Sequence, residues 1–381
     1  MARILRSRVG LVMLSVVAAG IVVVAAQRMT QAQEVAFPDL ALLESVPEPL
    51  GNPTTAEKVE LGRLLFFDPR MSADGSLSCN SCHSASTGFA AQTAISFAGP
   101  GTSHWRNVPT IVNVGYYSRF NRDGSKKVLD SQAAGAWGGS VAGNLDSALA
   151  EERLAQIPQY VQRFRNVFGT EYPHWEDALR AVAAYQRTIV SNLSPLDDWL
   201  AGDTSALSDE AQKGLRLFTG KAQCISCHNG ALISDDSFHA LGVPQNPVFL
   251  TDPLRQITFR FEQLAKGVSE EIYRTTDQDL GLFYVTKLDT DKGKFKTPSL
   301  RDVCYTAPYM HNGVFATLEE VVDFYDAGGG PTPNPDPLLR PLGLSDGDKA
   351  ALLAFLRGLC GDPVQDDVPQ LPAYGVFDEG E

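Results

Sequence analysis

The stretch Cys79-Asn80-Ser81-Cys82-His83 recurs in the second half of the chain as Cys224-Ile225-Ser226-Cys227-His228. Two thiols separated by two residues can add to the two vinyl groups of one porphyrin, and the adjacent His then directs its imidazole at the iron. The pattern therefore predicts two covalently bound c-type haems, with His83 and His228 as iron ligands. A zinc half-site and a thioredoxin-like redox pair are the alternatives, but neither motif has a second ligand pair nearby at the spacing of a zinc finger.

The start of the chain has the pattern of an export signal. Arg3, Arg6 and Arg8 precede a weakly polar stretch, so residues 1–26 match a secretory signal peptide. Because haem attachment of this kind takes place outside the cytoplasm, we expect a periplasmic protein. An uncleaved N-terminal membrane anchor is the alternative, since the apolar stretch is at the lower limit for spanning a bilayer.

The chain is acidic, with a formal net charge of −13 over 381 residues. This charge argues against a nucleic-acid partner and favours a basic redox partner protein. Acidity that only keeps a protein soluble explains the charge equally well. The sequence does not indicate the oligomeric state.

A weak internal repeat indicates two similar domains. The segment Leu61–Phe66 precedes the first haem motif and Lys213–Phe218 precedes the second, each within an amphipathic stretch typical of a helix. Two copies of helix, loop and haem motif predict a mainly α protein with two cytochrome c-like domains that bind haem covalently. We place the N-terminal haem domain at 36–195 and the C-terminal one at 204–372.

Local signals place several helix ends. Thr54 and Glu57 match a capping box before the first repeat, and Ser208 can cap the helix of the second. An apolar periodicity predicts a further helix over 177–191. The loop 328–337, rich in Gly and Pro, is expected to wrap a haem.

The order of these motifs resembles the di-haem cytochrome c peroxidase and MauG family over almost the whole chain after the signal. Besides the haem motifs, the shared elements are Arg106–Thr110, 193–203, Phe295–Arg301 and Thr306–Gly313. In that family peroxide reacts at the amino-terminal haem, the carboxy-terminal haem stores or relays electrons, and a calcium ion lies between them. The resemblance implies that Asn107 and the carbonyl oxygens of Thr306 and Pro308 hold calcium. A loop-capping role is the alternative for Asn107.

The residue fourteen positions after His311 separates the subfamilies, being Met in the peroxidases and Tyr in MauG-like proteins. Here it is Tyr325. The resemblance therefore implies a phenolate ligand on the second haem, which favours ferric and higher-valent iron and lowers the reduction potential. The alternative is a core residue, because Leu318, Val321, Val322 and Tyr325 form one apolar helical stripe.

Two positions near the first haem depart from the family. In a register without gaps the inter-haem Trp falls on Arg122 and the distal Glu falls on Ala142, whereas Gln132 keeps the family's Gln. Arg cannot relay electrons, and Ala cannot transfer the proton of peroxide. His104 is a catalytic candidate in place of the Glu, with Gln132 beside it. His104 could instead be a sixth ligand of the first haem or a structural loop residue.

Cys304 and Cys360 are the cysteines outside the haem motifs. In an oxidising compartment such a leftover pair favours a disulfide over free thiols.

Two classes of function are consistent with these residues. The first is a periplasmic di-haem oxidoreductase that uses hydrogen peroxide or high-valent haem iron to oxidise an electron donor, which for a MauG-like member could be a side chain on a partner protein. The alternative is a non-catalytic di-haem electron-transfer cytochrome that lacks the distal acid.

Overall fold

The computed structural model describes residues 39–375, which fall within one compact unit and are mainly helical, as predicted. The predicted signal peptide or anchor, 1–26, lies outside the described residues. Within the part that is described, no helix has both the length and the apolar character needed to cross a membrane.

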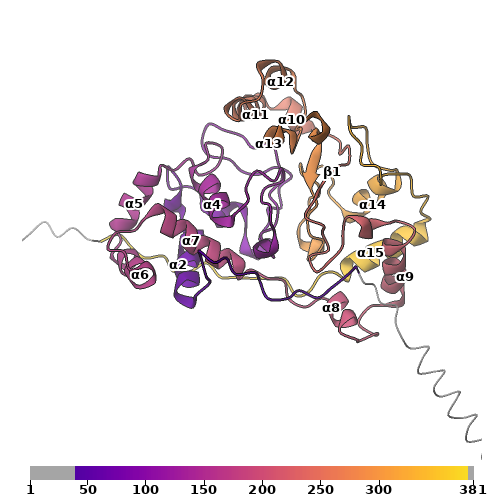
Figure 1. The fold of residues 1–381 in the computed structure, drawn as a ribbon, viewed down its shortest axis with the longest axis horizontal. Helices are drawn as coiled ribbons and strands as arrows, with labels where there is room; N and C mark the ends of the chain where they lie inside the picture. Colours follow the sequence, from indigo (N-terminus) through magenta and orange to yellow (C-terminus); the bar gives the residue numbers. More distant parts are fainter. Residues whose placement is uncertain (1–38, 376–381) are drawn as a thin grey trace, which may run out of the picture. The chain divides into compact units, whose positions relative to one another are not determined.

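Fourteen α-helices and one short sheet make up the described fold (Figure 1). The first half contributes α2 (Ala56–Phe67), α3 (Cys79–Cys82), α4 (Leu129–Gly138), α5 (Ser147–Ala155), α6 (Pro158–Phe168) and α7 (Trp175–Arg187). The second half contributes α8 (Pro195–Leu200), α9 (Asp209–Thr219), α10 (Pro247–Thr251), α11 (Pro253–Ala265), α12 (Glu270–Thr275), α13 (Phe283–Thr286), α14 (Leu318–Asp326) and α15 (Asp346–Arg357). Strands β1 (Phe238–Ala240) and β2 (Lys294–Lys296) pair antiparallel.

Each half is built on a helix pair that crosses at a glycine. In the first half α2 packs on α7, and a Cβ at Gly62 would lie 1.9 Å from the carbonyl oxygen of Ala181. In the second half α9 packs on α15, and a Cβ at Gly214 would lie 2.0 Å from the carbonyl oxygen of Ala351. Only Gly permits these close approaches. The repeated glycines of the sequence therefore correspond to the same helix crossing in both halves, each just before a haem motif.

The two ends of the described chain cross between the halves. At the start, the carbonyl oxygen of Asp39 accepts a hydrogen bond from the backbone of Gly230 at 2.6 Å. At the end, the yellow segment after α15 runs back along the first half, where Asp366 pairs with Arg63 at 2.7 Å and Gly375 donates to the carbonyl of Gln156 (Figure 1). The domain boundaries stay a prediction, and these terminal segments tie the two predicted domains together.

The expected helix ends are partly correct. The capping box at Thr54 is wrong: Thr55 caps α2 by accepting from the backbone of Lys58, and the Thr54 hydroxyl instead accepts from the Arg187 guanidinium at 2.9 Å. Ser208 caps α9, as predicted. The helix expected over 177–191 ends at Arg187, because the chain then turns to hydrogen bond with a neighbouring loop.

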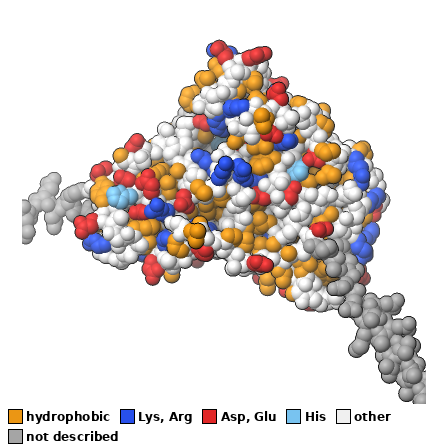
Figure 2. Space-filling view, in the orientation of Figure 1, with side chains coloured by type: hydrophobic (Ala, Val, Ile, Leu, Met, Phe, Trp, Pro, Cys, Tyr) orange, Lys and Arg blue, Asp and Glu red, His pale blue; other side chains and the backbone are white. Residues whose placement is uncertain are grey.

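Helices α10 to α13 form a separate lobe, seen at the top of Figure 1. Its small apolar core includes Phe249, Phe259 and Tyr284, and it takes in Trp105 from the first half. Hydrophobic side chains also gather on the outside of the lobe, where Ile257 is 65% exposed (Figure 2). The lobe belongs to the second half by sequence but covers part of the first.

Candidate functional site

Both haem motifs open onto one cavity of about 810 Å³. The four motif cysteines line it and form no disulfide. Burial raises the pKa of the Cys79 and Cys224 thiols to about 12, so both thiols are neutral. Two pairs of free thiols that face one large cavity fit thioether attachment to two haems.

The two motif histidines are held in the same way. Nδ1 of His83 lies 3.2 Å from the carbonyl oxygen of Phe89, and Nδ1 of His228 lies 3.2 Å from that of Ile233. A carbonyl oxygen can only accept, so each Nδ1 carries the proton and each Nε2 keeps its lone pair. Burial lowers the pKa of both imidazoles to about 4, which keeps them neutral. This is the state in which a histidine binds iron.

The polar atoms around the cavity also fit a large anionic cofactor. Nε1 of Trp105 and Nε of Arg122 are buried without a hydrogen-bond partner in residues 39–375, and both side chains line the cavity. Buried donors of this kind need acceptors. Together with the thiols and imidazoles, they fit haem groups that bring carboxylates.

Tyr325 lies on α14 in the wall of this cavity. Burial, and then the nearby Cys224 and Cys227, raise the pKa of its phenol. The rest of the apolar stripe of α14, including Val321, lines the same cavity. The stripe therefore faces the second haem motif, and the structure brings Tyr325 together with the residues that would attach that haem.

His104 and Gln132 line the cavity together with Ala142. Nδ1 of His104 accepts two backbone hydrogen bonds, from Trp105 at 3.0 Å and from Arg106 at 3.1 Å. Nδ1 is therefore unprotonated and Nε2 carries the proton. Burial lowers the pKa of His104 to about 4. This neutral tautomer can donate from Nε2, but it offers iron no free lone pair, which argues against a sixth-ligand role.

Sequence reasoning missed a carboxylate beside the first pocket. Glu262 lies on α11 and accepts a hydrogen bond from the Ser140 hydroxyl at 2.5 Å. Both residues line the cavity, and Ser140 belongs to the same loop as Ala142. No local motif could have revealed the pair, because its members are 122 positions apart.

A buried ion-pair network crosses the interior. The guanidinium of Arg106 lies between Asp123, at 2.8 Å, and Asp279, at 2.5 Å. Beside it, Nη2 of Arg122 donates to Oδ1 of Asn107 at 2.8 Å. Thr306 and Pro308, the other residues expected to hold calcium, also line the cavity.

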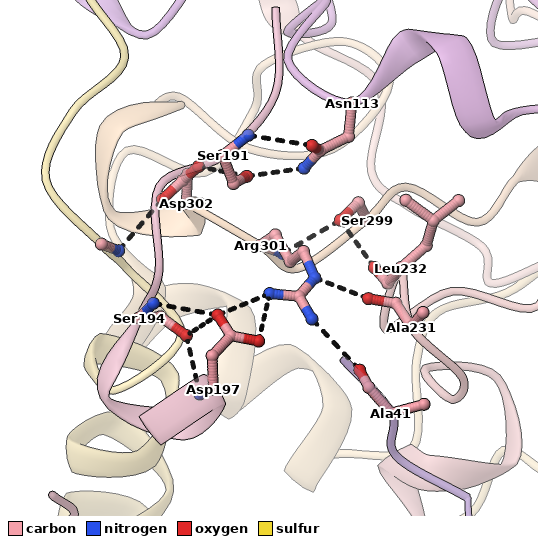
Figure 3. A network of polar contacts seen from close by, with 11 residues as sticks. Ala41, Asn113, Ser191, Ser194, Asp197, Ala231, Leu232, Ser299, Arg301 and Asp302 are labelled. Carbon is pink, nitrogen blue, oxygen red and sulfur yellow. Dashed lines mark hydrogen bonds and ion pairs between the residues drawn. The ribbon is translucent and has the colours of Figure 1, made fainter. Parts of the chain in front are cut away.

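Arg301 organises the loop that carries the second haem motif (Figure 3). Its Nη1 donates to both carboxylate oxygens of Asp197 at 2.9 Å, and its Nε donates to the carbonyl of Ala231 at 2.5 Å. Its Nη2 reaches the carbonyl of Ala41 at 3.2 Å. The arginine thus joins α8, the N-terminal segment and the haem loop that precedes Ile233.

Two further side-chain pairings hold the second half. His239 lies between Asp235, at 2.9 Å, and Asp336, at 2.5 Å, and so ties the predicted haem-wrapping loop 328–337 to β1. Cys304 and Cys360 form a disulfide across 56 positions.

A helical fold in which two Cys-x-x-Cys-His motifs share one cavity defines a di-haem c-type cytochrome, and this chain belongs to the di-haem cytochrome c peroxidase family, whose sequence profile matches residues 56–205. It is 52% identical over 339 residues to the cytochrome-c peroxidase IdrP1 of Denitromonas iodatirespirans, covering 88% of this chain and 90% of that protein.

The similarity extends to the MauG branch. The chain is 36% identical over 330 residues to the methylamine utilization protein MauG of Methylorubrum extorquens, covering 86% of this chain and 85% of that protein. The crystal structure of a MauG-like protein associated with microbial copper homeostasis superposes with a TM-score of 0.71 at 29% identity, covering 87% of this chain and 96% of that one. Family membership implies two c-type haems and a peroxidase-type oxidoreductase.

Proposed function

We propose that this protein is an exported enzyme that uses hydrogen peroxide to oxidise an electron donor, with the peroxide pocket on the His83 side of the cavity. One observation carries the proposal: His83 and His228, each with Nε2 free, open onto the same cavity. When bound there, the two haems supply iron that takes electrons from a donor and delivers them to peroxide. The signal pattern of 1–26 supports export.

At the second motif we propose Tyr325 as the sixth ligand. Its phenol is buried in the cavity wall beside Cys224 and Cys227, and residues 311–381 contain no Met. A hard, anionic oxygen ligand lowers the reduction potential of a haem. Such a site holds oxidising equivalents well, and only its ferric state is a poor acceptor of electrons from ordinary cytochromes.

Reducing one peroxide to two waters consumes two electrons and two protons, so the first pocket needs a proton carrier. We propose Glu262 for this role, since it lines the cavity and its carboxylate accepts a hydrogen bond from Ser140, in the loop where the family's Glu is replaced by Ala142. Ser140 holds the carboxylate in place. His104, which carries its proton on Nε2, and Gln132 are suited to orient peroxide by donating hydrogen bonds.

The donor we favour is a basic protein, because the chain has a net charge of −13 and opposite charges speed encounter. Oxidation of a side chain on such a partner is the MauG-like form of the same proposal. The second candidate function, a non-catalytic electron carrier, is favoured by the Ala at position 142.

The test is to supply the purified holoprotein with peroxide and a reduced basic c-type cytochrome. The proposal expects peroxide-dependent oxidation of about two donor cytochromes per peroxide, slowed by salt. If both haems can be reduced but peroxide causes no donor oxidation, the electron-carrier function replaces the enzyme.

A further inference from the structure

We infer that the guanidinium of Arg122 stands where the family places a calcium ion, so that this chain carries its own fixed cation between the two haem motifs and binds no calcium there. The inference concerns metal content and does not depend on peroxide turnover.

The side chain that would hold calcium is already engaged. Asn107 is 3% exposed, and its Oδ1 accepts from Nη2 of Arg122 at 2.8 Å. Its Nδ2 donates to the carbonyl of Thr93 at 3.2 Å, and its backbone amide donates to the carbonyl of His311 at 2.8 Å. The oxygen that the resemblance assigns to calcium therefore faces a permanently charged group instead.

A calcium ion beside this oxygen would be close to the Arg122 guanidinium. Like charges repel more strongly where water is partly excluded, and Arg122 is half-buried in the cavity wall. Calcium also requires six to eight oxygen ligands, usually with carboxylates among them. The donor set at Asn107 therefore does not fit the ion.

The nearby carboxylates are not free to supply the negative charge that a calcium site usually needs. Asp123 is 1% exposed, pairs with Arg106 at 2.8 Å and faces Lys266 at 4.0 Å. Asp279 also pairs with Arg106, at 2.5 Å. Both acids are thus neutralised by Arg106, not by Arg122.

Arg122 is itself placed as a bridge between the halves. Its carbonyl oxygen accepts from the backbone of Lys296 in β2 at 2.9 Å, while its side chain reaches Asn107 in the first half. The titratable groups that act on its guanidinium are Tyr117 and Arg106, with no carboxylate among them in residues 39–375, and its Nε is buried without a partner. A half-buried cation without a carboxylate partner is suited to anions brought into the cavity, such as the carboxylates of the haems.

The experiment measures calcium in the holoprotein and in three variants. Protein desalted into calcium-free buffer is analysed by elemental mass spectrometry and then titrated with CaCl2 by calorimetry, with the haem absorbance recorded. Arg122→Gln removes the charge but keeps an amide, Arg122→Trp restores the family's residue, and Lys127→Gln removes an exposed positive charge from the same loop. Haem content and far-UV circular dichroism identify any variant that fails to fold.

We expect no stoichiometric calcium in the wild type or in Lys127→Gln, and no response of either to CaCl2 or chelator. At least one Arg122 variant is expected to gain a site, with at least tenfold tighter calcium binding and a calcium-dependent absorbance change. One tightly held calcium per wild-type chain would overturn the inference. Calcium-free wild type together with folded Arg122 variants that also fail to bind calcium would show that Arg122 is not the reason, and would overturn it as well.

Discussion

Replacing Arg301 by Met should destabilise the protein through Asp197. Arg301 and Asp197 are 2% and 3% exposed and share two hydrogen bonds of 2.9 Å. Removing the guanidinium leaves a buried carboxylate that keeps only Ser194 as a side-chain-oxygen partner within residues 39–375, through its hydroxyl at 2.7 Å and its backbone amide at 2.9 Å. Breaking one side of a buried pair costs about 3–5 kcal/mol. We expect a loss in this range in the free energy of unfolding.

The assay is urea unfolding of the holoprotein followed by far-UV circular dichroism, with haem absorbance as a local probe. Arg357→Met is the matched control, because Arg357 forms an exposed pair with Glu319 that is worth at most about 1 kcal/mol. The double variant Asp197→Asn, Arg301→Met should lose less than Arg301→Met alone, since no unpaired carboxylate remains.

The Arg301 variant should also loosen the second haem loop, because it loses the hydrogen bond to the Ala231 carbonyl. We expect the absorbance of the second haem to change at lower urea than that of the first. A loss in Arg301→Met no greater than that in Arg357→Met would refute the reasoning.

Three further predictions concern catalysis, covalent structure and pH. Glu262→Gln should slow peroxide turnover about 10²-fold or more in protein with both haems attached. Glu271→Gln, which changes an exposed acid on α12, should not slow it. Equal steady-state rates in the two variants would show that Glu262 does not transfer the proton. The disulfide between Cys304 and Cys360 closes a span of 56 positions, so the double variant Cys304→Ser/Cys360→Ser should lose about 4 kcal/mol in the free energy of unfolding, measured in urea. Reductant should cause the same loss in the wild type and none in the double variant. Hydrogen bonds to Cys227, Asp336 and Asp235 raise the pKa of His239 above its ordinary value, and the two carboxylates remain as partners when Cys227 carries haem. Its stabilisation is therefore complete below pH about 6.5 and is lost as the pH rises through the raised pKa, so the gap in unfolding midpoint between wild type and His239→Gln should close at high pH; a constant gap would contradict the paired state.

The parts of this molecule that follow local rules could be predicted from the sequence. The haem motifs bring their ligands within five residues, Ser208 caps α9, and the repeated Gly62 and Gly214 mark equivalent crossings. Each of these depends on neighbours in the chain or on a steric limit that only Gly meets.

The parts that depend on distant contacts could not be predicted. Glu262 reaches the first pocket because the α10–α13 lobe folds over Trp105, and no periodicity in the sequence encodes that return. Thr55 caps α2 instead of Thr54, because the Thr54 hydroxyl accepts a hydrogen bond from Arg187. Tertiary hydrogen bonds decided both outcomes.

The central claim is that peroxide reacts within the cavity that joins the two haem motifs. The most direct measurement is to add one equivalent of hydrogen peroxide to the fully oxidised holoprotein, without donor, and to follow the haem absorbance by stopped flow. We expect a rapid spectral change that persists until a donor is added and that is slowed in Glu262→Gln. An unchanged spectrum in wild-type protein with both haems attached would contradict it.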